Sequence, residues 1–83
     1  MENQIKAAIL KAIDDAEVHV LDPRCDGVHL EAVVISDTFE GKLPLARQRG
    51  IMKALSDLFE TGLHALALKT YTKNEWEQHN ANE

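Results

Sequence analysis

Apolar residues recur along the first sixteen positions with the spacing of one helix face. Asn3 precedes this stripe and is a candidate N-cap, because its side chain can accept a hydrogen bond from a free backbone N–H. The stripe follows the period of 3.6 residues and consists of Ile5, Ala8, Ile9, Ala12, Ile13 and Ala16. The pattern therefore predicts an amphipathic helix with one buried side.

Two short segments rich in β-branched residues follow, and they predict a pair of strands at 18–21 and 28–36. The loop between them, residues 22–27, gathers the turn formers Asp, Pro and Gly. One face of the second strand is polar at its start and apolar at Val33 and Ile35. We therefore expect another element to cover the far end of that face.

A second helix is predicted to begin at Pro44, which suits the first helical turn because its missing N–H is not needed there. Gly62 is placed to end this helix in a left-handed conformation. Gly50, inside it, costs roughly 1 kcal/mol relative to alanine, and close packing against the sheet would explain a glycine there. The predicted buried stripe is Leu45, Met52, Leu55, Leu58 and Phe59, with Ile51 at its margin.

Residues 63–71 predict a third strand, and Thr72 and Glu75 have the spacing of a capping box before a final helix that carries Trp76. The connection from the second strand to the third is long enough for a right-handed parallel crossover. The expected fold is a single α+β domain over residues 1–77, in the order αββαβα. It has a three-stranded mixed sheet with helices on one face, and residues 78–83 form a frayed polar tail.

The composition adds limits on compartment and activity. The 83 residues are 45 % apolar and carry a net charge of -5, which suits a soluble globular domain. A single cysteine cannot form an internal disulfide, so we expect a reducing, cytoplasmic compartment. So small a domain has little room for a deep catalytic cleft, and no phosphate loop or nucleophile elbow occurs. We therefore expect a protein that is not an enzyme.

Three residues are candidate ligands for a soft metal centre. Cys25 lies in the Pro- and Gly-bearing loop and is either an idle exposed thiol or a thiolate ligand. His29 follows it after three residues, a spacing that is common by chance. His64 comes soon after Gly62 and is either a hydrogen-bonded histidine at the rim of the core or a ligand. A [2Fe–2S] cluster needs four protein or cofactor ligands, so this chain offers part of such a set.

A run of four cations without an acid extends over residues 42–53 and comprises Lys42, Arg47, Arg49 and Lys53. It is either a solvated helix face or a docking patch for an acidic partner, glutathione carboxylates or nucleic-acid phosphates. The remaining sequence contains all 14 acidic residues, which disfavours long-range attraction to nucleic acid.

Several stretches resemble the BolA family: residues 39–42, Arg47-Gln48-Arg49, and above all residues 63–72 followed by Glu75-Trp76. The loop at residues 25–30 is most similar to the BolA/IbaG-type bacterial members, although many relatives have glycine where Cys25 stands. The resemblance implies a fold similar to class II KH domains. It also implies a monothiol glutaredoxin partner, with which a glutathione-bound [2Fe–2S] cluster is shared in a heterodimer.

The resemblance identifies His64 as a cluster ligand and places the second ligand in the loop, where Cys25 and His29 remain alternatives. The main hypothesis is therefore an iron–sulfur adaptor for cluster trafficking or iron sensing. A second hypothesis is a nucleic-acid-binding transcriptional regulator that uses the basic run, since some family members are described as regulators. The Gly-x-x-Gly loop of KH domains is missing, because the corresponding connection has only Gly41. A third hypothesis is a metal-free interaction scaffold.

Overall fold

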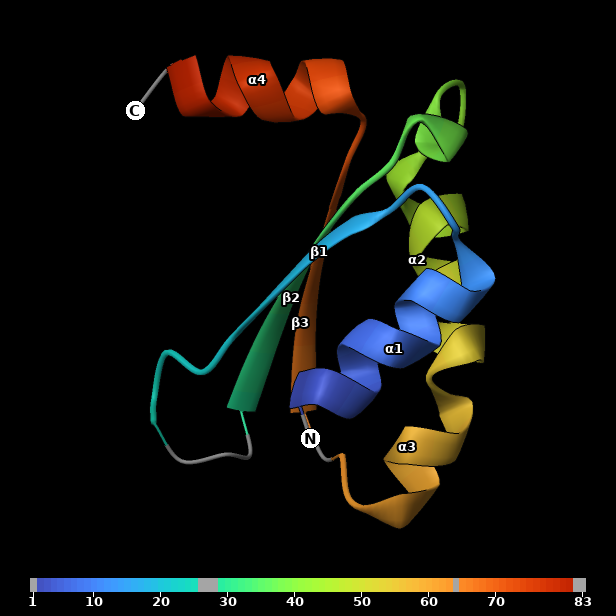
Figure 1. Cartoon of the computed structure of the whole chain (residues 1–83), viewed down its shortest axis with the longest axis vertical. Helices are drawn as coiled ribbons and strands as arrows, with labels where there is room; N and C mark the ends of the chain where they lie inside the picture. Colours follow the sequence, from blue (N-terminus) through green and yellow to red (C-terminus); the bar gives the residue numbers. More distant parts are fainter. Residues whose placement is uncertain (1, 26–28, 64, 82–83) are drawn as a thin grey trace.

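Helices and strands follow one another along the chain in the predicted order. The computed structural model describes residues 2–25, 29–63 and 65–81. Its elements are α1 (Glu2–Ala12), β1 (Glu17–Leu21), β2 (His29–Ile35), the 3₁₀ helix η1 (Asp37–Phe39), α2 (Pro44–Ala54), α3 (Ser56–Thr61), β3 (Ala65–Tyr71) and α4 (Lys73–Ala81) (Figure 1). None of the helices in these described ranges is long and apolar enough to cross a membrane.

The three strands form one mixed sheet with β2 in the centre. β1 runs antiparallel to β2, with Glu17 opposite Ile35, and β3 runs parallel to β2, with His29 opposite Ala65. The predicted mixed sheet and parallel crossover are therefore confirmed. The parallel register brings the first residues of β2 and β3 to the same end of the sheet.

The helices α1, α2 and α3 cover one face of the sheet, as Figure 1 shows. The buried core on that face is made by Ile5, Ile9, Val18, Leu30, Val34, Phe39, Ile51, Leu55 and Leu63. Its members come from α1, from β1 and β2 and from the segment between β2 and β3, so burial of this apolar surface holds these helices on the sheet.

The helix α4 lies on the other side, so the expectation of helices on one face holds for three of the four. Its Trp76 stacks on His19 of β1 with ring centroids 6.1 Å apart, and it borders the same shallow surface as Ile35. Val33 and Ile35 are buried on this face. The cover expected over the apolar far end of β2 is therefore α4, and the apolar surface there is the physical reason for its position.

The single helix predicted after Pro44 is two helices, because Leu55 leaves the helical conformation at φ -95° and ψ 1°. The buried face of α2 is also rotated from the predicted one. Arg47 and Ile51 point inward, while Leu45 and Met52 are 59 % and 38 % exposed. The prediction failed because it assigned an arginine to the solvent side, whereas this arginine is buried and pairs with Glu75.

Most predicted helix ends are correct. Pro44 begins α2, and Gly62 ends α3 with a positive φ of 151°. The capping box before α4 is present: the Glu75 N–H donates to Thr72 Oγ1 at 3.1 Å, and the Thr72 N–H donates to Glu75 Oε1 at 2.8 Å. Asn3 is not an N-cap, because α1 already includes it. Helix α4 continues to Ala81, so residues 78–81, expected to be frayed, are helical.

Candidate functional site

The loop after β1 and the starts of β2 and β3 meet at one end of the sheet, at the bottom of Figure 1. We call this the open end and define it by residues 23–25, His29 and Ala65. A surface depression of about 370 Å³ lies here, lined by Pro23, Arg24, His29, Leu30, Glu31, Ala65, Leu66 and Ala67. The loop residues therefore lie beside the beginning of β3, which is distant in sequence.

Cys25 is an exposed free thiol at the open end. Its N–H donates to the carbonyl of Asp22 at 3.1 Å, which closes a turn and brings the residue to a φ of 55°. The left-handed region costs a residue with a Cβ about 1 kcal/mol or more. A cysteine in a position that suits glycine is a local conflict of the kind found at functional sites.

His29 is the first residue of β2, and its side chain is exposed. His64, the histidine that the family resemblance marks most strongly, lies outside the described residues. Its sequence neighbours are described: Leu63 is buried in the core, and Ala65 pairs with His29 across the parallel ladder. Of the three predicted ligands, the structure thus places Cys25 and His29 at one end of the sheet.

The donor types at the open end fit a soft metal centre, because a thiol and an imidazole are both accessible there. Within residues 2–25, 29–63 and 65–81, no group of three or more His, Cys, Asp or Glu is arranged to hold a metal ion. The described residues therefore provide part of a ligand set. A centre built on them requires further ligands from position 64, a cofactor or a second protein.

Arg47 does not belong with the other cations of the basic run. Its side chain is 8 % exposed, and its two terminal nitrogens lie 2.8 and 3.4 Å from the carboxylate oxygens of Glu75. The guanidinium also lies over the Phe39 ring, 5.6 Å from its centroid. Hydrogen bonds from Arg47, and then from the Thr72 backbone, lower the pKa of Glu75. Arg47 thus fastens α4 to α2 rather than docking a partner.

The other three cations of the run, Lys42, Arg49 and Lys53, are exposed. They remain available for a docking surface, which is one charge smaller than the sequence predicts. Arg49 and Lys53 lie one turn apart on α2, whereas Lys42 precedes that helix.

A polar cluster that the sequence analysis missed joins the turn after α1 to the end of β2. The hydroxyl of Ser36, which is fully buried, donates to Asp15 Oδ1 at 2.6 Å, and the Thr38 hydroxyl donates to the same oxygen at 3.2 Å. The Ser36 bond is the main reason why the pKa of Asp15 lies below its usual value. A serine two residues before a threonine at a strand end was the available signal, since such hydroxyls often cap the following turn.

This cluster and the Arg47–Glu75–Thr72 group lie at the opposite end of the sheet from the candidate ligands. We call them together the closed end. Their contacts are complementary donors and acceptors within the fold, which indicates a structural role.

The comparisons with known proteins agree with this architecture. Residues 1–75 match the profile of the BolA family, described as BolA-like protein. The DNA-binding transcriptional regulator BolA of Vibrio cholerae is 35 % identical over 80 residues, which cover 96 % of this chain and 74 % of that protein.

Two solved structures superpose well. A bolA protein homologue from Coxiella burnetii has a TM-score of 0.78 and 38 % identity, with 93 % of this chain and 96 % of the other covered. The BolA domain of SufE1 from Arabidopsis thaliana has a TM-score of 0.75 and 31 % identity, with 88 % and 92 % covered. Sequence and fold thus agree along nearly the whole length, and the chain belongs to the BolA family.

Proposed function

We propose that this protein is a non-enzymatic, cytoplasmic partner of a monothiol glutaredoxin and shares a glutathione-ligated [2Fe–2S] cluster with it, in iron–sulfur trafficking or iron sensing. The observation that carries the proposal is the open end, where the thiol of Cys25 and the imidazole of His29 are both accessible and His29 pairs with Ala65 at the start of β3. Membership of the BolA family adds the expectation of a glutaredoxin partner.

In this proposal His64 and one of the two loop residues, Cys25 or His29, bind one iron. The cluster, when bound, supplies a labile iron–sulfur unit that can be passed on or can report iron supply. An imidazole ligand in place of a thiolate raises the reduction potential of such a centre. The strained backbone at Cys25 favours a role for its thiol, since the fold itself gains nothing from a cysteine at a φ of 55°.

The surroundings of these donors suit a bound partner. The depression beside them has apolar walls from Leu30, Ala65 and Leu66, and Arg24 stands at its edge. Apolar walls exclude water from a docked surface, and an arginine there can pair with a carboxylate of glutathione or of the partner.

The test is anaerobic reconstitution of the full chain with a monothiol glutaredoxin, iron, sulfide and glutathione, followed by visible absorption, circular dichroism and iron analysis. We expect a coloured heterodimer whose spectrum changes in His64→Ala. Of Cys25→Ser and His29→Ala, the variant that alters the spectrum identifies the loop ligand. His19→Ala is the matched control, because His19 lies on β1 against Trp76 and outside the open end.

Two results contradict the proposal. One is a mixture that stays colourless under reconstitution. The other is a heterodimer that forms equally well without iron and keeps its properties in every ligand variant, which favours the metal-free scaffold.

A second candidate function is DNA binding, which the name of the Vibrio cholerae relative supports. Lys42, Arg49 and Lys53 are the exposed cations that would contact phosphate. The charge of -5 opposes this function, and the connection before α2 has one glycine, Gly41, at a φ of 76°. An electrophoretic shift that persists at physiological salt and weakens in the double variant Arg49→Ala/Lys53→Ala would support it.

A further inference from the structure

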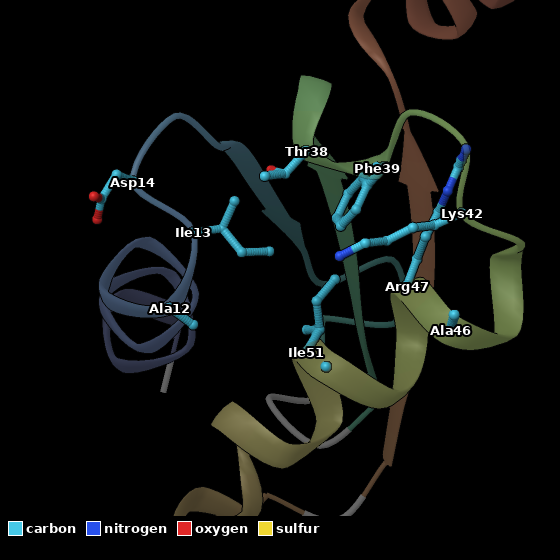
Figure 2. Close-up of a pocket in the computed structure, with 10 residues that line it drawn as sticks. Ala12, Ile13, Asp14, Thr38, Phe39, Lys42, Ala46, Arg47 and Ile51 are labelled. Atoms are coloured by element: carbon cyan, nitrogen blue, oxygen red, sulfur yellow. The ribbon is translucent and has the colours of Figure 1, made fainter.

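A second concave site lies away from the open end, between the last turn of α1, η1 and the first half of α2. Figure 2 shows this pocket, which has a volume of about 440 Å³. We call it the α1–α2 pocket. The residues that matter to its chemistry are Ile13, Phe39, Lys42, Gly50 and Ile51. Its size falls within the roughly 300–1,000 Å³ typical of small-molecule sites.

Gly50 is part of the pocket wall and has no packing reason to be a glycine. Close packing against the sheet, the explanation that the sequence suggests, is wrong: a Cβ added at Gly50 would meet no atom within 4 Å. Glycine inside a helix costs stability relative to alanine. The absence of a side chain therefore leaves open space beside α2 at a cost to the helix.

Lys42 gives this pocket a positive charge. Figure 2 shows its side chain crossing the pocket, with the amino group between Phe39 and Ile51. Among the described residues, no carboxylate forms an ion pair with Lys42. Asp14 is at the rim, and Figure 2 shows its carboxylate turned away from the pocket.

The other nearby cation is already neutralised. Arg47 contributes to the pocket wall, but its guanidinium pairs with Glu75 at 2.8 Å. The pocket therefore combines apolar walls with one uncompensated amino group. Such a combination matches a ligand with one negative charge and an apolar body.

We propose that the α1–α2 pocket binds a small organic carboxylate with an apolar body. The Lys42 amino group pairs with the carboxylate, and the accessible apolar residues of the lining, Ala12, Ile13 and Ala46, contact the apolar part. A phosphorylated ligand fits less well, because one lysine offers a single charge and the net charge of -5 repels a dianion. The proposal is independent of the cluster-sharing function.

The test uses octanoate as the probe, added to the full-length ¹⁵N-labelled chain and followed by two-dimensional NMR. We expect saturable shifts of the amide signals of Lys42, Ala46 and Gly50. Octanol lacks the charge and acetate lacks the apolar body, so both should bind at least about tenfold more weakly.

Two variants and one control localise the binding. Lys42→Met should weaken octanoate binding about tenfold or more, while Lys53→Met removes the same charge outside the pocket and should leave it unchanged. Gly50→Leu fills the open space, so it should stay folded and lose binding.

Three outcomes would overturn the proposal: no saturable shifts at the pocket, equal losses in Lys42→Met and Lys53→Met, or a folded Gly50→Leu protein that binds as the wild type does. If Gly50→Leu does not fold, comparison of Lys42→Met with Lys53→Met still decides whether octanoate binds in the pocket.

Discussion

The two ends of the sheet are built differently. At the closed end, Asp15, Ser36 and Thr38 share hydrogen bonds, and Glu75 accepts hydrogen bonds from both Arg47 and the Thr72 backbone. At the open end, Cys25 and His29 are exposed, and Cys25 adopts a strained backbone conformation. The hydrogen-bonded clusters and the proposed ligands thus lie at opposite ends of the sheet.

This separation has a physical reason. Residues that bind a ligand must be accessible to it, whereas residues that hold a fold bond to one another. A domain of 83 residues has little stability to spare, so contacts that hold its elements together compete with binding for the same side chains. Placing the two groups of residues at opposite ends of the sheet avoids that competition.

The largest effect is expected from Glu75→Ala at the closed end. The change leaves the buried guanidinium of Arg47 without its carboxylate and removes half of the capping box of α4. We expect a loss of about 2 kcal/mol in the free energy of unfolding, measured by urea denaturation. Glu77→Ala, on the same helix but exposed, is the control, and equal losses in both variants would remove the distinction between the ends.

The second-largest effect is expected from acid, which should weaken the hydrogen bonds of the closed end. The pKa of Asp15 is lowered mainly by the Ser36 hydroxyl, and that of Glu75 mainly by Arg47, from ordinary values of 3.8 and 4.5. A lowered pKa in the folded state means that the stabilisation is complete above the ordinary value and disappears as the pH falls through the folded one.

We therefore expect stability to be steady down to about pH 5 and then to fall. Urea denaturation at several pH values should show a shallower fall in Glu75→Gln than in the wild type. A wild-type curve that is flat between pH 5 and 3 would contradict this assignment.

At the open end, Cys25→Gly should increase stability. Glycine adopts a φ of 55° without the cost that a Cβ imposes, so we expect a gain of about 0.5–1 kcal/mol in spite of the greater chain entropy of glycine. Thermal unfolding measures it, with Cys25→Ser as the control that keeps the strain. A stabilised Cys25→Gly protein with altered cluster assembly would show that this position sacrifices stability for chemistry, whereas a destabilised one would mean that the cysteine supports the fold.

The smallest effect concerns an imperfection near the closed end. Leu43 is the N-cap of α2 with an extended backbone, yet its side chain makes no capping hydrogen bond and is 77 % exposed. Leu43→Ser should raise the free energy of unfolding by about 0.5 kcal/mol, because the serine hydroxyl can accept a hydrogen bond from a free N–H of the first turn. Leu45→Ser, two residues further on and inside α2, lacks this geometry and should not raise the free energy of unfolding.

The sequence predicts most of the architecture, because period and turn chemistry act locally. The stripe from Ile5 to Ala16, the turn formers at 22–27 and the Thr72–Glu75 box each predict an element that the structure contains. The predicted buried face of α2 is wrong because Arg47 points inward and pairs with Glu75, which lies 28 residues away. A local pattern does not contain that partner.

The candidate site shows the same limit. Residue chemistry identifies Cys25 and His29 as donors, but the proximity of His29 to the start of β3 depends on its parallel register with Ala65. The bond between Ser36 and Asp15 likewise joins residues 21 positions apart. Side chains that meet through tertiary structure cannot be paired from spacing alone.

The parallel pairing of β2 with β3 also affects how the protein matures. These strands are neighbours in space but are separated along the chain by η1, α2 and α3. Closing so long a connection is a late and slow event, because its entropy cost precedes the reward of pairing. In a chain that is still being synthesised or has paired its strands wrongly, the candidate ligands therefore lie far apart. Only a molecule that has completed its sheet assembles the open end, so the cluster binding proposed there would depend on successful folding.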